Sequence, residues 1–166
     1  MHELGHALTA RKYGARPEIL LHSFGGLAIY NDRQTRGQRL RVIAAGPGYG
    51  LVLGSAALLV WFFLLPRLPF RPNDFLLELV WVLMWINIAW SLLNMLPILP
   101  LDGGQFLEAW MRGDKRRLRG QIGTGVAIAV VVFALFYGWF FVAIMFGFFA
   151  YQNYQVAEGK PMRRMF

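Results

Sequence analysis

The sequence predicts an all-α polytopic membrane protein, a helical bundle with a short β-hairpin after its first helix. Hydrophobic residues make up 57% of the 166 residues and charged residues only 16%, against about 25% charged residues in a typical soluble domain. The apolar residues also gather into long runs, and a helix of about 20 apolar residues spans the hydrocarbon core of a bilayer. A chain of this length fits one domain, so we expect residues 1–166 to form a single membrane-embedded domain.

Basic residues lie between the apolar runs, and their distribution indicates which loops face the cytoplasm. The segments 11–41 and 112–119 are rich in lysine and arginine, whereas the segment 66–74 holds only Arg67 and Arg71. Loops rich in these residues face the cytoplasm, so we expect both basic segments there and residues 66–74 on the opposite side. The clusters lack interleaved exposed aromatic residues, so the net charge of +8 does not indicate nucleic-acid binding.

The chain is expected to begin with a helix over residues 1–13, which ends near Gly14. The apolar segment 18–30, interrupted by Gly25 and Gly26, then suits two short strands joined in a hairpin. The first helix is too short to span a bilayer alone. We therefore expect further apolar residues upstream of its start.

Long apolar runs define the remaining helices. Runs over residues 40–65 and 75–96 each end at prolines, and a shorter helix is expected over 104–112. The last run, 122–151, is ambiguous, because a single helix of this length would be about 45 Å long. The charge distribution favours two helices that turn near Gly138, whereas the lack of a polar turn residue favours one tilted helix. Both alternatives stay open.

The first residues carry a metal-binding pattern, HELGH. The chain has no cysteine, so a metal would be held by histidine or carboxylate ligands. His2 and His6 lie four residues apart on one helix face, where both imidazoles can bind one zinc ion. Glu3 lies about 100° around the helix from His2 and suits a general base that takes a proton from a zinc-activated water. The alternative is a polar helix end that contains two histidines by coincidence.

Asp102 is the candidate third ligand, since catalytic zinc has three protein ligands and one open position. It follows an apolar run within the segment NMLPILPLDGG, and a carboxylate at membrane depth is costly and therefore indicates function. By itself, Asp102 is equally well explained as the N-cap of a helix over residues 103–111. Beside HELGH, the ligand interpretation is favoured.

Together, HELGH and, about 90 residues later, NMLPILPLDGG resemble the site-2 protease family of intramembrane zinc metalloproteases. The resemblance implies one zinc ion per chain, held by His2, His6 and Asp102, with Glu3 as the general base. It also implies that three further residues of the later motif lie near the substrate or support the zinc ligands. These residues are Asn94, Pro97 and Gly103.

The resemblance extends to the intervening segment and covers residues 1 to about 112. The sequence AGPGYG at 45–50 is similar to a small-residue element of the family, and Phe24-Gly25-Gly26 is similar to its strand segment. Gly46, Gly50 and Gly54 recur every fourth residue, which we interpret as a stripe for close helix approach rather than as a catalytic feature. The usual helix before HELGH and the PDZ or CBS domains are not recognisable, so the chain resembles the minimal membrane core.

The function implied is an intramembrane zinc endopeptidase that cleaves peptide bonds within membrane-spanning protein or peptide substrates, as in regulated intramembrane proteolysis. The expected setting is the lipid bilayer of a prokaryotic cell (inner) membrane, with the active site near the cytoplasmic side. The alternative is a non-catalytic scaffold or transporter-like fragment with buried polar residues. A scaffold has no need for a metal site, so zinc binding distinguishes the two. The sequence indicates no oligomeric state.

Overall fold

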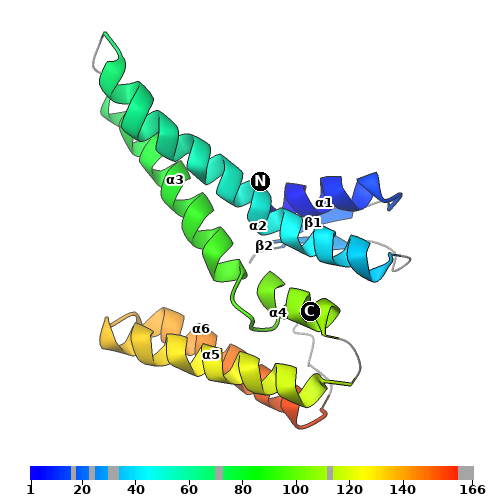
Figure 1. The fold of residues 1–166 in the computed structure, drawn as a ribbon. Coiled ribbons are helices and arrows are strands. Elements are labelled where there is room, and N and C mark those ends of the chain that lie inside the picture. The colour runs from blue at the N-terminus through cyan, green and yellow to red at the C-terminus, as the bar shows by residue number, and fades with distance from the viewer. Residues whose placement is uncertain (16–17, 23–24, 30–33, 70–72, 112–113, 161–166) are drawn as a thin grey trace. The chain divides into compact units, whose positions relative to one another are not determined.

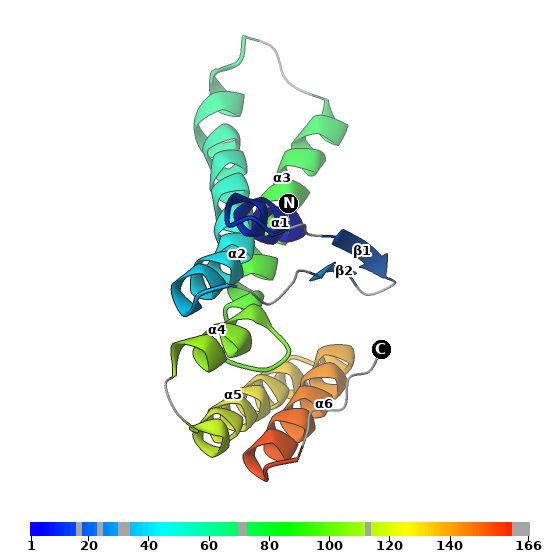
Figure 2. The same cartoon turned by 90° about the vertical axis from the view of Figure 1, so that its right-hand side faces the viewer.

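The computed structural model describes residues 1–15, 18–22, 25–29, 34–69, 73–111 and 114–160. The chain divides into two compact units, Met1–Asn94 and Met95–Phe166, and each is described on its own. Helices dominate both units (Figures 1 and 2). Some residues used in the sequence-based expectations lie outside the described ranges: Phe24, residue 30 of the expected hairpin, Arg71, and residue 112 of the expected short helix.

The first unit opens with α1 (His2–Lys12). Its end agrees with the predicted stop, because Gly14 has a φ of +83°, in the left-handed region that glycine tolerates best. The stretch expected to hold a hairpin contains β1 (Glu18–His22) and β2 (Gly25–Ile29). These strands pair antiparallel, with Glu18 opposite Ile29 and His22 opposite Gly25.

The helix α2 (Arg36–Leu59) begins before the predicted residue 40. The reason is a capping box: the Gln38 N–H donates to Thr35 Oγ1 at 3.4 Å, and the Thr35 N–H donates to Gln38 Oε1 at 2.8 Å. The predicted start at residue 40 is therefore wrong, because this reciprocal bonding satisfies donors of a helical turn that begins earlier. The helix continues through a π-helical segment (Val60–Leu64) and a 3-10 turn (Leu65–Arg67).

The helix α3 (Asp74–Asn94) returns alongside α2 (Figures 1 and 2). Two glycines of α2 make this approach close. A Cβ at Gly50 would lie 2.1 Å from Ser91 Oγ, and one at Gly54 would lie 2.6 Å from the Ile88 side chain. The predicted role of these glycines in close helix approach is confirmed.

The second unit contains the loop 95–101, α4 (Asp102–Trp110), α5 (Arg116–Phe136) and α6 (Phe140–Ala157). The ambiguous apolar run is thus two helices, and they turn at Gly138, which has a φ of +74°. The Trp139 N–H donates to Ala134 O at 2.8 Å and closes the turn. No polar side chain is required, because backbone groups and a left-handed glycine make the reversal.

The helix α4 begins two residues before the predicted position, and its N-cap is Leu101, without a side-chain cap. Asp102 is the first helical residue. The alternative interpretation of Asp102 as the N-cap of residues 103–111 is therefore wrong. The loop folds against the first turn instead, since a Cβ at Gly104 would lie 2.5 Å from the Leu99 nitrogen.

Within the described residues, three helices are long and apolar enough to cross a membrane: Arg36–Arg67, Asp74–Asn94 and Arg116–Phe136. Many large apolar side chains on them are exposed to the surroundings, among them Trp85, Ile86 and Phe136. Soluble monomers rarely expose so much apolar surface. The coarse prediction of a helical integral membrane protein agrees with this pattern.

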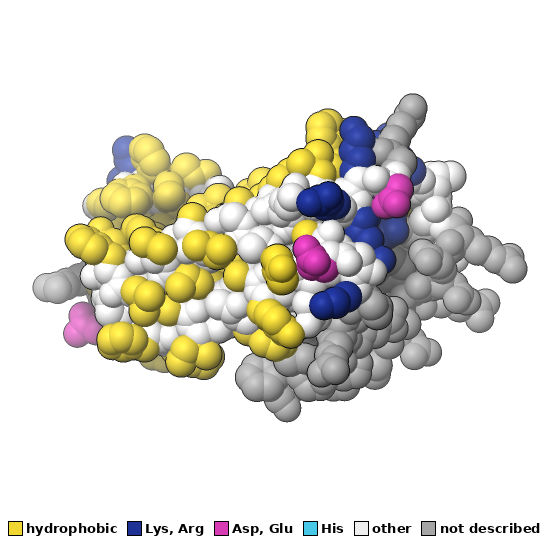
Figure 3. Space-filling model, turned by 90° about the horizontal axis from the view of Figure 1, so that it is seen from below, with side chains coloured by type: hydrophobic (Ala, Val, Ile, Leu, Met, Phe, Trp, Pro, Cys, Tyr) yellow, Lys and Arg dark blue, Asp and Glu magenta, His cyan; other side chains and the backbone are white. Residues whose placement is uncertain are grey.

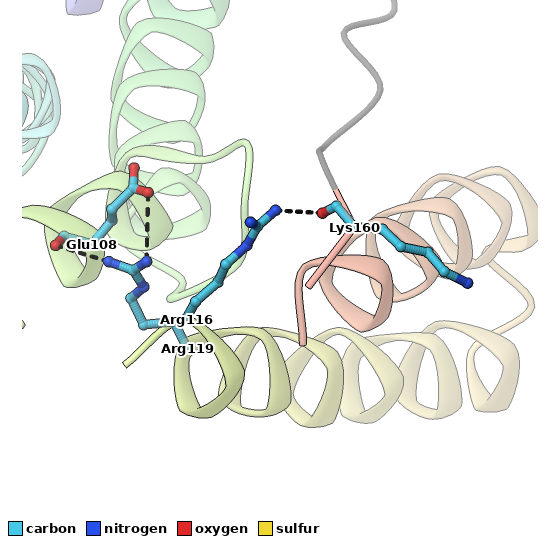
Figure 4. A network of polar contacts seen from close by, with 4 residues as sticks. All are labelled: Glu108, Arg116, Arg119 and Lys160. Carbon is cyan, nitrogen blue, oxygen red and sulfur yellow. Dashed lines mark hydrogen bonds and ion pairs between the residues drawn. The ribbon is translucent and has the colours of Figure 1, made fainter. Parts of the chain in front are cut away.

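Charge and apolar surface separate along the second unit. On the face seen in Figure 3, hydrophobic side chains cover one part, and basic and acidic side chains gather mainly at the other end. Arg119 of α5 lies 3.8 Å from Glu108 of α4 and also donates to the Glu108 backbone oxygen. Arg116 donates to the backbone oxygen of Lys160, just after α6 (Figure 4). These basic side chains thus connect the start of α5 to α4 and to the segment just after α6.

Candidate metal centre

The HELGH segment forms the first turns of α1, which packs on α2. A Cβ at Gly5 would lie 2.5 Å from Ala45 O, so only glycine lets the two backbones come this close. His6 points into this contact and is 7% exposed. Close packing of α1 on α2 therefore places one candidate ligand inside the first unit.

The tautomer of the neutral His6 ring follows from its backbone partner. His6 Nδ1 lies 2.8 Å from Val42 O. A carbonyl oxygen can only accept, so Nδ1 carries a proton, and in the neutral ring the lone pair is on Nε2. Metal-binding histidines typically donate their second ring N–H to a carbonyl or carboxylate in this way, which orients the ring.

His2 approaches His6 Nε2 through its own Nε2 atom. The two Nε2 atoms are 3.3 Å apart, and the rings meet edge to face at 78°. With zinc–nitrogen bonds of 2.0–2.1 Å at a tetrahedral angle, two ligand nitrogens are about 3.3–3.4 Å apart. The same separation also allows one imidazole N–H to donate to the other ring. The histidine pair thus has the spacing of two ligands on one zinc ion.

Gly46 provides the space in which the His6 ring lies. A Cβ at this position would be 2.1 Å from His6 Nε2 and 2.4 Å from Cε1. Gly46 therefore differs from Gly50 and Gly54, which face α3. The stripe was predicted to serve close packing alone, but one of its members shapes the surroundings of His6 Nε2, the candidate ligand atom.

The other predicted site residues occupy different positions. Glu3 is half-buried in the first turn of α1, and Asp102 opens α4 in the second unit. Asn94 is buried as the last residue of α3 and donates to Trp90 O at 2.9 Å. Pro97 lies in the loop 95–101. The roles of these residues toward zinc or substrate stay predictions.

Gly103 has a packing role that the sequence did not indicate. A Cβ there would lie 2.2 Å from Met95 O and 2.3 Å from Leu96 O. The glycine therefore lets the loop backbone lie directly on the start of α4. This contact accounts for its residue type without a direct contact to substrate.

Sequence reasoning overlooked Asn153 on α6. This residue is 1% exposed and bonds to both backbone groups of Leu99, three residues before Asp102. A signal was present, because Gln152 and Asn153 interrupt an otherwise apolar segment. Polar side chains in such a setting require internal partners.

Comparison with known proteins identifies similar zinc metalloproteases. The model of peptidase family M50 matches residues 71–138, a range that contains Asp102 but not HELGH. A zinc metalloprotease from Methanocaldococcus jannaschii is 31% identical over 81% of this chain and 40% of its own length. Rip3 of Mycobacterium tuberculosis, named as a candidate zinc metalloprotease, is 34% identical over 81% of this chain and 35% of its own length.

Among solved structures, a site-2 protease from Methanocaldococcus jannaschii is similar over 99% of this chain and 76% of its own, with a TM-score of 0.64 and 26% identity. The chain spans well under half the length of the two curated relatives above. The similar solved structure agrees with the helical architecture. By these matches, the chain belongs to the site-2 protease family of zinc metalloproteases.

Proposed function

We propose that the chain is an intramembrane zinc endopeptidase in which His2, His6 and Asp102 hold one zinc ion. The observation that carries the proposal is the histidine pair, whose Nε2 atoms face each other at 3.3 Å while His6 Nδ1 is held by Val42 O. Its substrates are membrane-spanning proteins or peptides. In this proposal the two units work as one protease domain over residues 1–166.

The proposed ligands supply the donor set that catalytic zinc prefers. Two neutral imidazoles and one carboxylate leave a fourth position for water or substrate. When bound, zinc supplies Lewis acidity that polarises the scissile carbonyl and activates water. Asp102 is the proposed third ligand because a carboxylate at membrane depth is costly and indicates function, and because catalytic zinc has three protein ligands.

Glu3 is proposed as the general base. It follows His2 directly and lies in the first turn of α1, so its carboxylate is near the histidine pair but about 100° away around the helix. This position suits proton transfer rather than ligation. Glu3 takes a proton from the attacking water and delivers it to the leaving amine.

Zinc content tests the ligand assignment. The protein purified in detergent should contain close to one zinc ion per chain, and Asp102→Asn and His6→Ala should each lose most of it. Asp114→Asn, at an exposed residue outside the helices, is the matched control and should keep its zinc. A parent protein without zinc affinity overturns the proposed function, and full zinc content in Asp102→Asn overturns the third ligand.

The proposed location is a prokaryotic cell (inner) membrane, with the basic helix ends and the active site on the cytoplasmic side. Single cysteines test this orientation, because the chain has none of its own. Pro69→Cys should react with an impermeant thiol reagent from outside intact cells. Gly37→Cys and Asp114→Cys, both at exposed positions, should react only after permeabilisation. Labelling of all three from one side contradicts the proposed orientation.

A further inference from the structure

Asn153 makes a set of hydrogen bonds that the proposed chemistry does not use. Its Oδ1 accepts from the Leu99 N–H at 3.1 Å. Its Nδ2 donates to Leu99 O at 2.8 Å and to Phe149 O at 2.8 Å. One buried amide on α6 thereby binds both backbone groups of a single residue in the loop 95–101, and we call this arrangement the Asn153 clamp.

The start of α4 also packs against the loop 95–101. Cβ atoms at Gly103 and Gly104 would lie within 2.6 Å of backbone atoms of Met95, Leu96 and Ile98. The loop also bonds to itself, since the Leu101 N–H donates to Ile98 O at 2.8 Å. The backbone that leads into Asp102 therefore contacts both α6 and the first turn of α4.

Gly123 of α5 provides the space for the clamp. A Cβ at this residue would lie 2.1 Å from Asn153 Oδ1 and 2.7 Å from Cγ. Both atoms belong to the amide that bonds Leu99. Any side chain at this position would have to push the amide away from the loop, whereas a Cβ at Gly125 meets nothing within 4 Å.

We propose that Asn153 is a positioning residue, which sets the loop 95–101 so that Asp102 is presented as a zinc ligand. This inference rests on the proposed function. One of the three hydrogen bonds goes to the preceding turn of α6, and the other two go to a residue only three positions before Asp102. Supporting contacts of this kind typically change metal affinity by 10–100-fold when they are removed.

Two substitutions remove the clamp in different ways. Asn153→Leu keeps the approximate size and branching of the side chain but removes all its hydrogen bonds. Gly123→Ala keeps the amide but occupies the space of its oxygen, and it tests the same contact if the leucine variant does not fold. Gly125→Ala is the matched control, because it changes the same helix by the same methyl group at an open position.

Two measurements test the effect of these substitutions, one on the Leu99 amide and one on zinc binding. Hydrogen exchange of the Leu99 amide in zinc-free protein should accelerate at least about tenfold in Asn153→Leu and Gly123→Ala, since the amide loses its acceptor. The zinc dissociation constant, measured by chelator competition below each variant's melting temperature, should rise about tenfold or more in the same two variants. Gly125→Ala should match the parent in both.

A double variant checks that the two residues act on one contact. In Asn153→Ala the colliding amide is absent, so adding Gly123→Ala should cause little further change in zinc affinity. Unchanged Leu99 exchange in the single variants overturns the clamp. Faster exchange with an unchanged zinc dissociation constant overturns the positioning role. A parent protein that binds no zinc overturns the proposed function, and the exchange measurement still decides whether the clamp exists.

Discussion

His6 and Asn153 are both buried polar side chains on helices, and each lies against a glycine of a neighbouring helix. In the first unit, Gly46 of α2 gives room to His6 of α1. In the second unit, Gly123 of α5 gives room to Asn153 of α6. The steric arrangement is the same, since in both places a missing Cβ leaves the volume that a polar group fills.

The two side chains differ in how they use their polar atoms. Asn153 directs both its oxygen and its nitrogen to backbone groups. His6 uses Nδ1 for Val42 O and directs Nε2 toward the corresponding nitrogen of His2. A lone pair directed at a second imidazole suits metal binding, whereas an amide saturated by the backbone suits positioning. Glycine–polar contacts alone therefore do not identify a ligand; the partners of the polar atoms do.

The largest expected effect is that of Gly46→Ala. The added methyl group would occupy the space of the His6 ring, so the ring must move and zinc affinity should fall at least about 100-fold, at or beyond the upper end for residues that support ligands. Zinc titration of the purified variant measures this. Gly48→Ala is the control, because a Cβ there meets nothing within 4 Å. Equal zinc affinity in both variants would show that Gly46 does not support the metal centre.

Glu3→Gln separates the residues that hold the metal from the residue that moves a proton. Peptide cleavage should fall at least about 100-fold, because amides are poor general bases, while zinc content stays near that of the parent. The measurement is the initial rate of cleavage of a membrane-anchored model substrate. Glu78→Gln on α3 serves as the control. Cleavage at the parental rate by the Glu3→Gln variant would show that another group is the base.

Gly50→Ala examines a third contact of the same kind, in which the polar partner is Ser91. The methyl group would lie 2.1 Å from Ser91 Oγ but 3.5 Å from its Cβ. Relative to Gly48→Ala, the variant should lose about 1–3 kcal/mol of stability, as expected for overpacking, and keep its zinc affinity. Adding Ser91→Ala should restore most of the loss. Thermal unfolding in detergent measures the stability, and a loss of zinc affinity would contradict a pure packing role.

The smallest effect is expected for Glu108→Gln. The ion pair with Arg119 is 3.8 Å long, and the Glu108 side chain is 39% exposed. Exposed pairs of this kind contribute at most about 1 kcal/mol, so the melting temperature should fall by less than about 4 °C. A larger fall would mean that the charged helix ends stabilise the second unit as strongly as its buried polar contacts do.

Local features of the molecule were predictable from the sequence. The spacing of His2 and His6 places both on one helix face, because the α-helix repeats every 3.6 residues. The end of α1 just before Gly14 follows from the ability of glycine to adopt positive φ, whereas the turn at Gly138 was only one of two alternatives that the sequence left open. The apolar runs predicted helices that suit a membrane. Each of these inferences needs only neighbouring residues and the solvent that surrounds them.

Element starts were less predictable. The helix α2 begins at Arg36 because Thr35 and Gln38 bond each other's backbone, a four-residue signal that the strongly basic composition obscured. The helix α4 begins at Asp102 because the preceding loop lies on Gly103 and Gly104. In neither case does the apolar pattern decide the first residue: α2 begins at a capping box, and α4 begins where the loop packs on two glycines.

Only the tertiary structure decided what the buried polar groups contact. The stripe of glycines indicated that Gly46 lies at a helix contact but not that it faces His6, and nothing in the neighbours of Gly123 shows that it faces Asn153. Asn153 bonds to a residue 54 positions earlier, and His6 bonds to one 36 positions later. Helical periodicity determines which residues share a face of one helix, but the approach of a second helix determines which hydrogen-bond partner and which free volume that face receives.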